Sequence, residues 1–492
     1  MTSPPAAGGQ KGSGPPRMLG DLTEGPIFRT LLIFSIPTLL SNILQSLNGT
    51  VNSIWVGQLI GEEALAATAN ANIIMFLMFS AGFGLGMAAT VQIGQRFGAR
   101  NIDGARRTLG TAIGFCFLLT LAISAAGWLL SPGLLRVLAT PGESYQLALD
   151  YLRMIFIAMP LLIVSIILTM GLRGAGDART PLIFMIVAVA LDVGLNPFFI
   201  AGIGPFPELG IIGSGVAMII ANLVSFAGML FYVYSKDLPL RLRGPEFAYL
   251  KPSANELRYI LTKGLPMGAQ MLVMSAAGII VIGLVNREGV MMTAAYGAAM
   301  QVFTYIQMPA MAIGAAVSAM AAQYIGARKW HALDELTRAG MIVNFLLTGA
   351  LTVLILLFDE PVFMLFFDRG SPAIPLAVHI QLLAAWNFVF FGVTMVMSGT
   401  MRAGGAVWIP LMILVVTLFP VRLGFYFLTY GELGADAIWL SFPVSAFASL
   451  GLAWWFYYHY NWRERAMAEA AEEAAEQVQA DAEPAGRINP SL

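Results

Sequence analysis

The sequence predicts an all-α integral membrane protein with twelve transmembrane helices, arranged in two six-helix lobes that are related by a pseudo-two-fold axis. Three observations lead to this prediction. Of the 492 residues, 58% are hydrophobic and only 11% are charged, whereas about 25% of the residues of an ordinary soluble domain are charged. The charged residues gather in short gaps between long apolar runs, and three motifs of the first half recur in the second half.

The apolar runs are long enough to be transmembrane helices. A helix needs about 20 residues to cross a hydrocarbon core of roughly 30 Å. A closed β-barrel would instead require alternating polar residues, which these continuous runs lack. The twelve expected spans are 31–60, 64–95, 108–135, 154–172, 180–206, 209–235, 264–286, 289–327, 339–358, 371–401, 403–430 and 437–461.

Repeated motifs divide the chain into two copies that are separated by a nearly constant offset in the sequence. Pro37 near the start of the first span corresponds to Pro266 in the seventh, and the sequence from Gln95 to Arg100 recurs as Gln323 to Arg328. The stretches 172–176 and 401–405 also match. We therefore expect an N-lobe at 27–235 and a C-lobe at 264–461, with an inter-lobe loop at 236–263. Each copy starts after an even number of spans, so the axis should run along the membrane normal.

The basic residues predict the orientation in the membrane. With a cytoplasmic N-terminus, all but five of the 27 Lys and Arg residues lie in the tails and the cytoplasmic loops, as the positive-inside rule requires. Both termini are therefore expected in the cytoplasm. Residues 1–26 are rich in Pro and Gly and contain no apolar signal-peptide core, which indicates a disordered tail. Residues 462–492, rich in Ala and Glu, indicate a second cytoplasmic tail.

One acid lies in the middle of the fifth span. Asp192 is near the centre of the apolar stretch from Pro181 to Ala201, where a carboxylate costs on the order of 2.5 to 3.5 kcal/mol and should face a cavity or a partner. Asn196 follows at i+4, on the same helical face. Pro197 then leaves one backbone carbonyl of the preceding turn without its donor. These residues predict a polar site inside the membrane.

A second polar group lies in the first span. Gln45, Asn48 and Asn52 are spaced i, i+3 and i+7 and therefore share one helical face. Two interpretations stand: the amides hold helices together, or they line the same cavity as Asp192. Arg422, inside the eleventh span, also has two interpretations, since it could extend outward to the interface or pair with a buried group.

Enzymatic functions are not predicted. The sequence shows no arrangement typical of a catalytic triad or a metal site, and the single cysteine, Cys116, excludes an internal disulfide. We expect no cofactor and no metal. The charges occupy short gaps between apolar runs, which argues against nucleic acid as a partner.

These motifs, in this order and in both halves, resemble those of the multidrug and toxic compound extrusion (MATE) family over about residues 25 to 460. The resemblance implies two six-helix lobes around a central cleft and a location in the inner membrane. It also implies efflux of organic, often cationic, compounds coupled to inward flow of protons or sodium ions.

The coupling residues that the resemblance implies belong to the N-lobe. One branch of the family uses acids in the seventh and tenth spans, but the corresponding residues here are Met274 and approximately Phe391. The DinF-like branch uses an N-lobe site, which corresponds here to Asn52, Asp192 and Asn196 as cation-coupling residues.

The resemblance also implies a substrate cavity. Gln45 keeps the polar residue of that branch, Asn48 lies on the same face, and Met218 replaces a common threonine. One acid remains where the branch often has two. This argues against sodium, because a hard cation prefers several oxygen ligands and more than one charge.

The sequence thus predicts a secondary antiporter in which protonation of Asp192 excludes a cationic or amphipathic substrate. Protonation would let the first and fifth spans bend at the hinges Pro37 and Pro197. The expected partners are small organic molecules, protons and the lipid bilayer, and a monomer suffices. The alternatives are sodium-coupled efflux, a flippase of lipid-linked saccharides, and a membrane enzyme or receptor in which Asp192 is structural.

Overall fold

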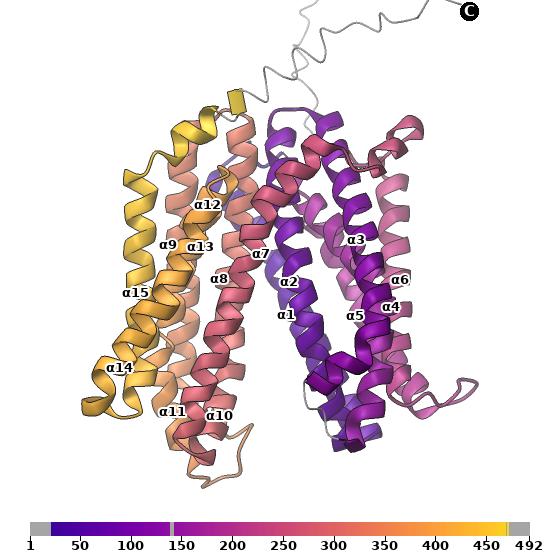
Figure 1. The fold of residues 1–492 in the computed structure, drawn as a ribbon. Helices are drawn as coiled ribbons and strands as arrows, with labels where there is room; N and C mark the ends of the chain where they lie inside the picture. Colours follow the sequence, from indigo (N-terminus) through magenta and orange to yellow (C-terminus); the bar gives the residue numbers. More distant parts are fainter. Residues whose placement is uncertain (1–20, 138–141, 469, 472–492) are drawn as a thin grey trace, which may run out of the picture.

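The structure, a computed structural model, describes residues 21–137, 142–468 and 470–471. Its N-lobe consists of six long helices (Figure 1). All six are long and apolar enough to cross a membrane. They are α1 (Ile27–Leu59), α2 (Glu62–Gly98), α3 (Ile102–Val137), α4 (Gly142–Gly174), α5 (Arg179–Ala201) and α6 (Ile211–Ser235).

The C-lobe contributes six further spans, two of which are made of more than one element. The tenth span combines α11 and α12, and the eleventh combines α13, the π-helical turn η2 and α14. The elements are α7 (Ala254–Arg287), α8 (Val290–Gly326), α9 (Trp330–Leu357), the short α10 (Asp359–Phe363), α11 (Ala373–Ala384), α12 (Asn387–Ala403), α13 (Trp408–Val416), η2 (Thr417–Val421), α14 (Arg422–Leu433) and α15 (Asp436–His459). The twelve-span prediction is confirmed.

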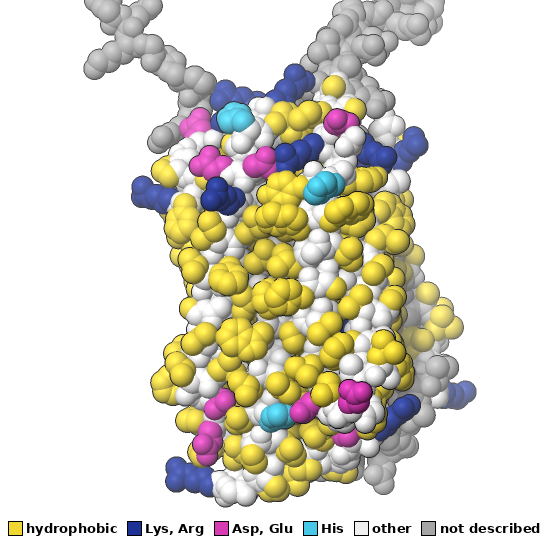
Figure 2. Space-filling model, turned by 90° about the vertical axis from the view of Figure 1, so that its left-hand side faces the viewer, with side chains coloured by type: hydrophobic (Ala, Val, Ile, Leu, Met, Phe, Trp, Pro, Cys, Tyr) yellow, Lys and Arg dark blue, Asp and Glu magenta, His cyan; other side chains and the backbone are white. Residues whose placement is uncertain are grey.

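The outer surface has the pattern of a membrane protein. Figure 2 shows a broad hydrophobic band between two rims of charged side chains. Exposed Leu, Ile, Phe and Trp side chains occur on helices of both lobes, for example Leu129 in the N-lobe and Leu428 in the C-lobe. Such a continuous apolar surface would be unfavourable in water and is favourable against lipid tails.

The lobes meet at the end of the molecule where both ends of the described chain lie, and they diverge toward the other end (Figure 1). We call these ends the terminal face and the opposite face. Between the lobes, α2 packs against α7 and α8, and α1 packs against α8. Gly84 of α2 approaches α7 so closely that a Cβ atom there would lie 2.3 Å from the Gly268 nitrogen. Small residues thus let the two lobes touch backbone to backbone.

The connection between the lobes differs from the expected loop at 236–263. It contains the 3₁₀ helix η1 (Gly244–Leu250), and α7 already begins at Ala254. Ser253 caps this extension, because its Oγ accepts a hydrogen bond from the Glu256 nitrogen at 3.4 Å. Glu256 in turn pairs with Arg96 at 2.7 Å. The charged residues that suggested a loop therefore belong to a helical turn docked on the N-lobe.

Parts of the two expected tails are ordered against the protein. The Leu22 nitrogen donates a hydrogen bond to Gln323 Oε1 at 2.9 Å, which attaches the first described residues to the C-lobe. Residues 462–468 are helical, and the ring of Trp462 packs against Gly404. The remainder of the tails, 1–20 and 472–492, lies outside the described residues.

Candidate functional site

The structure brings Asp192, Asn196 and Asn48 together inside the N-lobe. Asp192 on α5 is only 5% exposed and Asn196 only 1%. The Asn48 amide nitrogen, from α1, donates to Asp192 Oδ2 at 2.9 Å. The Asn196 amide nitrogen donates to Asp192 Oδ1 at 3.2 Å and to the Asp192 carbonyl oxygen at 2.8 Å. Amides from two helices thus solvate a carboxylate that water scarcely reaches.

Asn52 lies one turn further along α1 and joins a second part of the cluster. Its Oδ1 accepts a hydrogen bond from the Ser214 hydroxyl of α6 at 2.7 Å. Its side chain is also hydrogen-bonded to Tyr151 of α4, a residue that feels the charge of Asp192. Four helices therefore build the site. Sequence reasoning missed Ser214 and Tyr151, and neither residue stands out by spacing or by charge.

Two buried amide oxygens in this cluster have no hydrogen-bond partner among the described residues. They are Asn48 Oδ1 and Asn196 Oδ1, which belong to the two side chains that donate to Asp192. An unpaired buried polar atom costs about 1–3 kcal/mol and calls for an explanation. The site therefore has unused acceptor capacity next to its carboxylate, which a proton or a cation could use.

The other predicted site residues take different positions. Gln45 is exposed, and no hydrogen bond joins it to the cluster among the described residues. Met218 is half-buried on α6, and its carbonyl accepts a hydrogen bond from Asn222 at 2.8 Å. Pro37 and Pro197 lie inside α1 and α5, and both helices continue through them.

Arg422 in the C-lobe does not extend to the membrane surface. It is 8% exposed, at the start of α14. Its Nε and Nη2 atoms both donate to the Ser445 hydroxyl of α15, at 3.0 and 2.8 Å. The interpretation of Arg422 as a residue with a buried partner is therefore correct, although the partner is a neutral hydroxyl.

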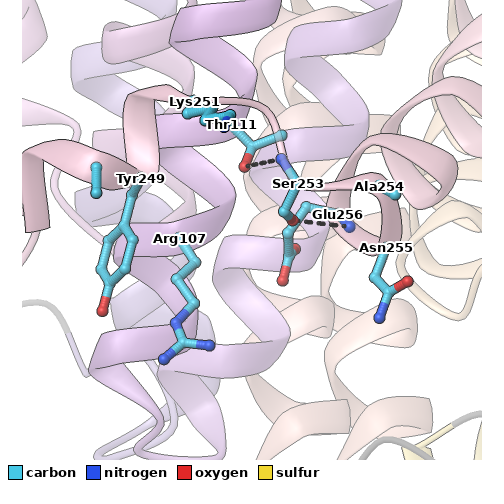
Figure 3. A pocket seen from close by; sticks show the side chains of 9 residues that line it. Arg107, Thr111, Tyr249, Lys251, Ser253, Ala254, Asn255 and Glu256 are labelled. Carbon is cyan, nitrogen blue, oxygen red and sulfur yellow. Dashed lines mark hydrogen bonds between the residues drawn. The ribbon is translucent and has the colours of Figure 1, made fainter. Parts of the chain in front are cut away.

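A separate cavity of about 440 Å³ lies near the terminal face, between α3, η1 and the start of α7 (Figure 3). Two of its charged groups, Arg107 and Glu256, are already paired. Arg107 bonds Asp103 at 2.9 Å and lies over the Tyr249 ring, and the Asp103 carboxylate raises the pKa of Tyr249 by accepting its hydrogen bond. The cavity marks the joint between the inter-lobe segment and the N-lobe. In the described part of the chain, three or more His, Cys, Asp or Glu residues nowhere gather as a metal site would require.

Twelve spans, two lobes with matching motifs and a buried carboxylate define a class of molecule. This is the architecture of membrane transporters built from two repeats related by an axis along the membrane normal. The MatE family model matches residues 37–198 and 266–428, which lie in the two lobes. The chain belongs to this family of multidrug and toxic compound extrusion transporters and is therefore a multi-pass membrane protein of a multidrug transporter family.

Individual relatives agree with this assignment. The chain is 33% identical over 441 residues to the probable multidrug resistance protein YoeA of Bacillus subtilis, covering 89% of this chain and 95% of that one. It is 26% identical to an FAD transporter of Shewanella oneidensis, over 62% of this chain and 67% of the relative. A solved structure described as the outward-facing conformation of a MATE transporter superposes with a TM-score of 0.83, at 22% identity and over 92% and 99% of the two chains. That similarity shows the same two-lobed fold.

Proposed function

We propose that this protein is a proton-coupled exporter of organic cations or amphipathic compounds, with Asp192 as the coupling residue. One observation carries the proposal. The only carboxylate within the N-lobe cluster is surrounded by amides that can serve both of its protonation states. The ionised form accepts hydrogen bonds from Asn48 and Asn196. The protonated form would need an acceptor, and the same two side chains hold unpaired oxygens.

The cluster also links protonation to helix position. Asp192 is bonded to α1 through Asn48, and Asn52 bonds α1 to α6. Loss of the negative charge weakens the first of these bonds, because hydrogen bonds to a charged acceptor are the stronger kind. Pro37 and Pro197 then provide positions at which α1 and α5 bend. The lobes would alternate between two arrangements around the site.

The orientation belongs to the same proposal. We place the terminal face in the cytoplasm of a bacterial inner membrane, because most Lys and Arg residues lie in the tails and in the loops at that face. Asp192 lies in the second half of α5, which ends at the opposite face. We expect external protons to approach the site from that face, toward which the lobes diverge.

The test is transport by the purified protein in proteoliposomes. Movement of a fluorescent organic cation is driven separately by a proton gradient and by a sodium gradient, in the wild type and in Asp192→Asn. Proton-driven transport should be lost in the variant, while its thermal unfolding midpoint stays within a few degrees of the wild type. Proton-driven transport that persists in a folded Asp192→Asn protein would refute the proposal.

Sodium coupling is the second candidate, and the same unpaired oxygens favour it. Asp192, Asn48 and Asn196 together offer a carboxylate and two free amide oxygens, which are ligands that a hard cation accepts. Transport driven by the sodium gradient alone would establish it.

The third candidate is a transporter of larger substrates. One relative is named as an FAD transporter, and a two-lobed transporter of this kind could also flip lipid-linked saccharides. Competition by these compounds in the same assay tests both.

A further inference from the structure

Arg422 is a buried cation without a buried counter-charge. Its two hydrogen bonds end on a single neutral atom, Ser445 Oγ, and its guanidinium carbon lies 4.4 Å from the centre of the Phe442 ring. No carboxylate contacts it among the described residues. A guanidinium has five N–H donors and keeps its charge. Most of its hydrogen-bonding capacity is therefore unused, inside the membrane-spanning part of the C-lobe.

Arg422 occupies the position of the C-lobe that corresponds to Asp192 in the N-lobe. The fifth and eleventh spans correspond through Pro181 and Pro410, which have the same offset as Pro37 and Pro266. In the eleventh span the π-helical turn η2 intervenes, and a π-helical turn accommodates about one residue more than an α-helical turn. After this turn, equivalent residues of the two repeats are therefore one residue further apart in the sequence than before it. With this extra residue, Asp192-Val193-Gly194 aligns with Arg422-Leu423-Gly424.

The backbone after these two spans supports the correspondence. Gly210, directly before α6, has φ 57° and ψ −134°. Gly434, between α14 and α15, has φ 56° and ψ −136°. The two loops thus contain a glycine in the same positive-φ conformation, and in both lobes the following helix packs against the span that carries the charge. The duplicated fold therefore carries opposite charges at equivalent buried positions.

Among the described residues, further donors without partners lie in the same part of the C-lobe as Arg422, in and beside the hydrophobic cluster that contains Phe442. Trp439 Nε1 is fully buried and unpaired, and its ring lies 5.4 Å from the ring of Tyr296. Tyr296 feels the charge of Arg422. Gln381 on α11, which packs against α8 and α15, is buried with both amide atoms unpaired. Unpaired buried polar atoms are exceptions in native proteins. Here, the unpaired donors are an indole N–H and an amide N–H, and the guanidinium of Arg422 is bonded only to the neutral Ser445 hydroxyl among the described residues.

We propose that these donors form an anion-binding site in the C-lobe, centred on Arg422, that takes the carboxylate of a zwitterionic organic substrate. A carboxylate matches the guanidinium in charge and in geometry. Asp192 in the N-lobe would attract the cationic end of the same compound. The proposal rests on the proposed export function and narrows its substrate class from cations to compounds that carry both charges. Chloride is also an anion that these donors could bind, so the experiment must distinguish a substrate carboxylate from chloride.

The test compares two dyes that differ in one group. Rhodamine 110 carries a free carboxylate, and its methyl ester, rhodamine 123, does not. Binding of each dye to the purified protein in lipid nanodiscs is measured by fluorescence anisotropy. The ratio of the two dissociation constants measures how much the free carboxylate contributes to binding. In Arg422→Gln the preference for the carboxylate dye should fall at least tenfold relative to the wild type, and Arg422→Lys should retain part of it.

Arg402→Gln is the matched control, because Arg402 is a similarly buried arginine of the C-lobe, bonded to Gln270 at 3.2 Å. Its loss should affect both dyes equally. Should Arg422→Gln not fold, Trp439→Phe removes one donor and should lower the carboxylate preference about threefold. An unchanged dye ratio in Arg422→Gln, or a wild type without any carboxylate preference, would overturn the proposal.

Chloride binding is tested by measuring thermal stability in a gluconate buffer and again after chloride has replaced the gluconate. If chloride raises the thermal stability of the wild type but not of Arg422→Gln, and the dye ratio is the same in both, the site takes an inorganic anion and the substrate proposal is wrong. Proton-driven transport of the methyl ester by the wild type reports on the export function separately. If the methyl ester is not transported, the export function is refuted. The ratio of the two dissociation constants still tests the anion site independently.

Discussion

Gln95 and Gln323 occupy equivalent positions of the two repeats, and each donates a hydrogen bond to the main chain of the other lobe. Gln95 Nε2 lies 2.7 Å from the Ala403 oxygen, and Gln323 Nε2 lies 3.0 Å from the Gly174 oxygen. Gly174 and Ala403 are themselves equivalent, because they lie within the matching stretches 172–176 and 401–405. The two bonds are therefore copies of each other across the pseudo-two-fold axis, and together they join the lobes near the terminal face.

Removing both bonds should weaken this junction. Each neutral hydrogen bond contributes about 0.5–1.5 kcal/mol, and Gln323→Leu also removes the bond from the Leu22 nitrogen to Gln323 Oε1. The double variant Gln95→Leu with Gln323→Leu should therefore shift the equilibrium toward lobe separation at this face by at least roughly tenfold. Pulsed electron paramagnetic resonance between spin labels at positions 179 and 338, in a Cys116→Ser background, measures the distance between the lobes. Gln301→Leu, an exposed position on α8, is the control. An identical distance distribution in the double variant would show that the bonds do not hold the lobes together.

A methyl group at Gly326 should have a larger effect. A Cβ atom there would lie 1.7 Å from the main-chain oxygen of Gln95, which belongs to the opposite lobe and cannot rotate away. Gly326→Ala should therefore lower the free energy of unfolding by about 1–3 kcal/mol. Gly297→Ala in the same helix meets nothing within 4 Å and should be neutral or slightly stabilising. Thermal unfolding of the two purified variants in detergent measures the difference, and equal midpoints would contradict the close approach.

The fold was accessible from the sequence because its signals are local. Long apolar runs fix the helices, and motifs such as those containing Gln95 and Gln323 recur at a nearly constant offset. The start of α7 was less predictable. Residues 254–263 carry charges that suggest a loop. Ser253 caps the helix locally, but its docking depends on the pairing of Glu256 with Arg96 on α2, which is far away in the sequence.

The site was accessible in part for the same reason. Asp192 and Asn196 share a face at i, i+4, and the acid is conspicuous in an apolar span. The pairing of Asn48 with Asp192 depends on how α1 packs against α5, which spacing within one helix does not specify. Ser214 and Tyr151 come from two further helices and have no local signal.

The bond from Asn48 to Asp192 should matter for coupling. A hydrogen bond to a charged group contributes about 1.5–3 kcal/mol when buried, and this one also joins α1 to α5. Asn48→Leu should reduce proton-driven transport at least tenfold, measured in proteoliposomes. Thr50→Val is the control, because the exposed Thr50 hydroxyl donates to the Ser46 carbonyl of its own helix and has no bond to the Asp192 cluster among the described residues. Wild-type rates in Asn48→Leu would mean that Asp192 acts without support from α1.

The segment between the lobes should depend on Arg106 of α3. This side chain is only 20% exposed and forms two bonds with the segment: Nε donates to the Pro239 oxygen at 2.8 Å, and Nη1 pairs with Glu246 at 2.7 Å. Arg106→Gln removes the charge and at least one bond, so residues 236–253 should detach more often and be cleaved by trypsin several times faster. Mass spectrometry of timed digests of the purified protein locates the cuts. Arg179→Gln, at an exposed position of α5, removes a basic residue without touching the segment and should leave the cleavage rate unchanged. If both variants were cleaved at the wild-type rate, the packing of η1 against α3 would hold the segment without Arg106.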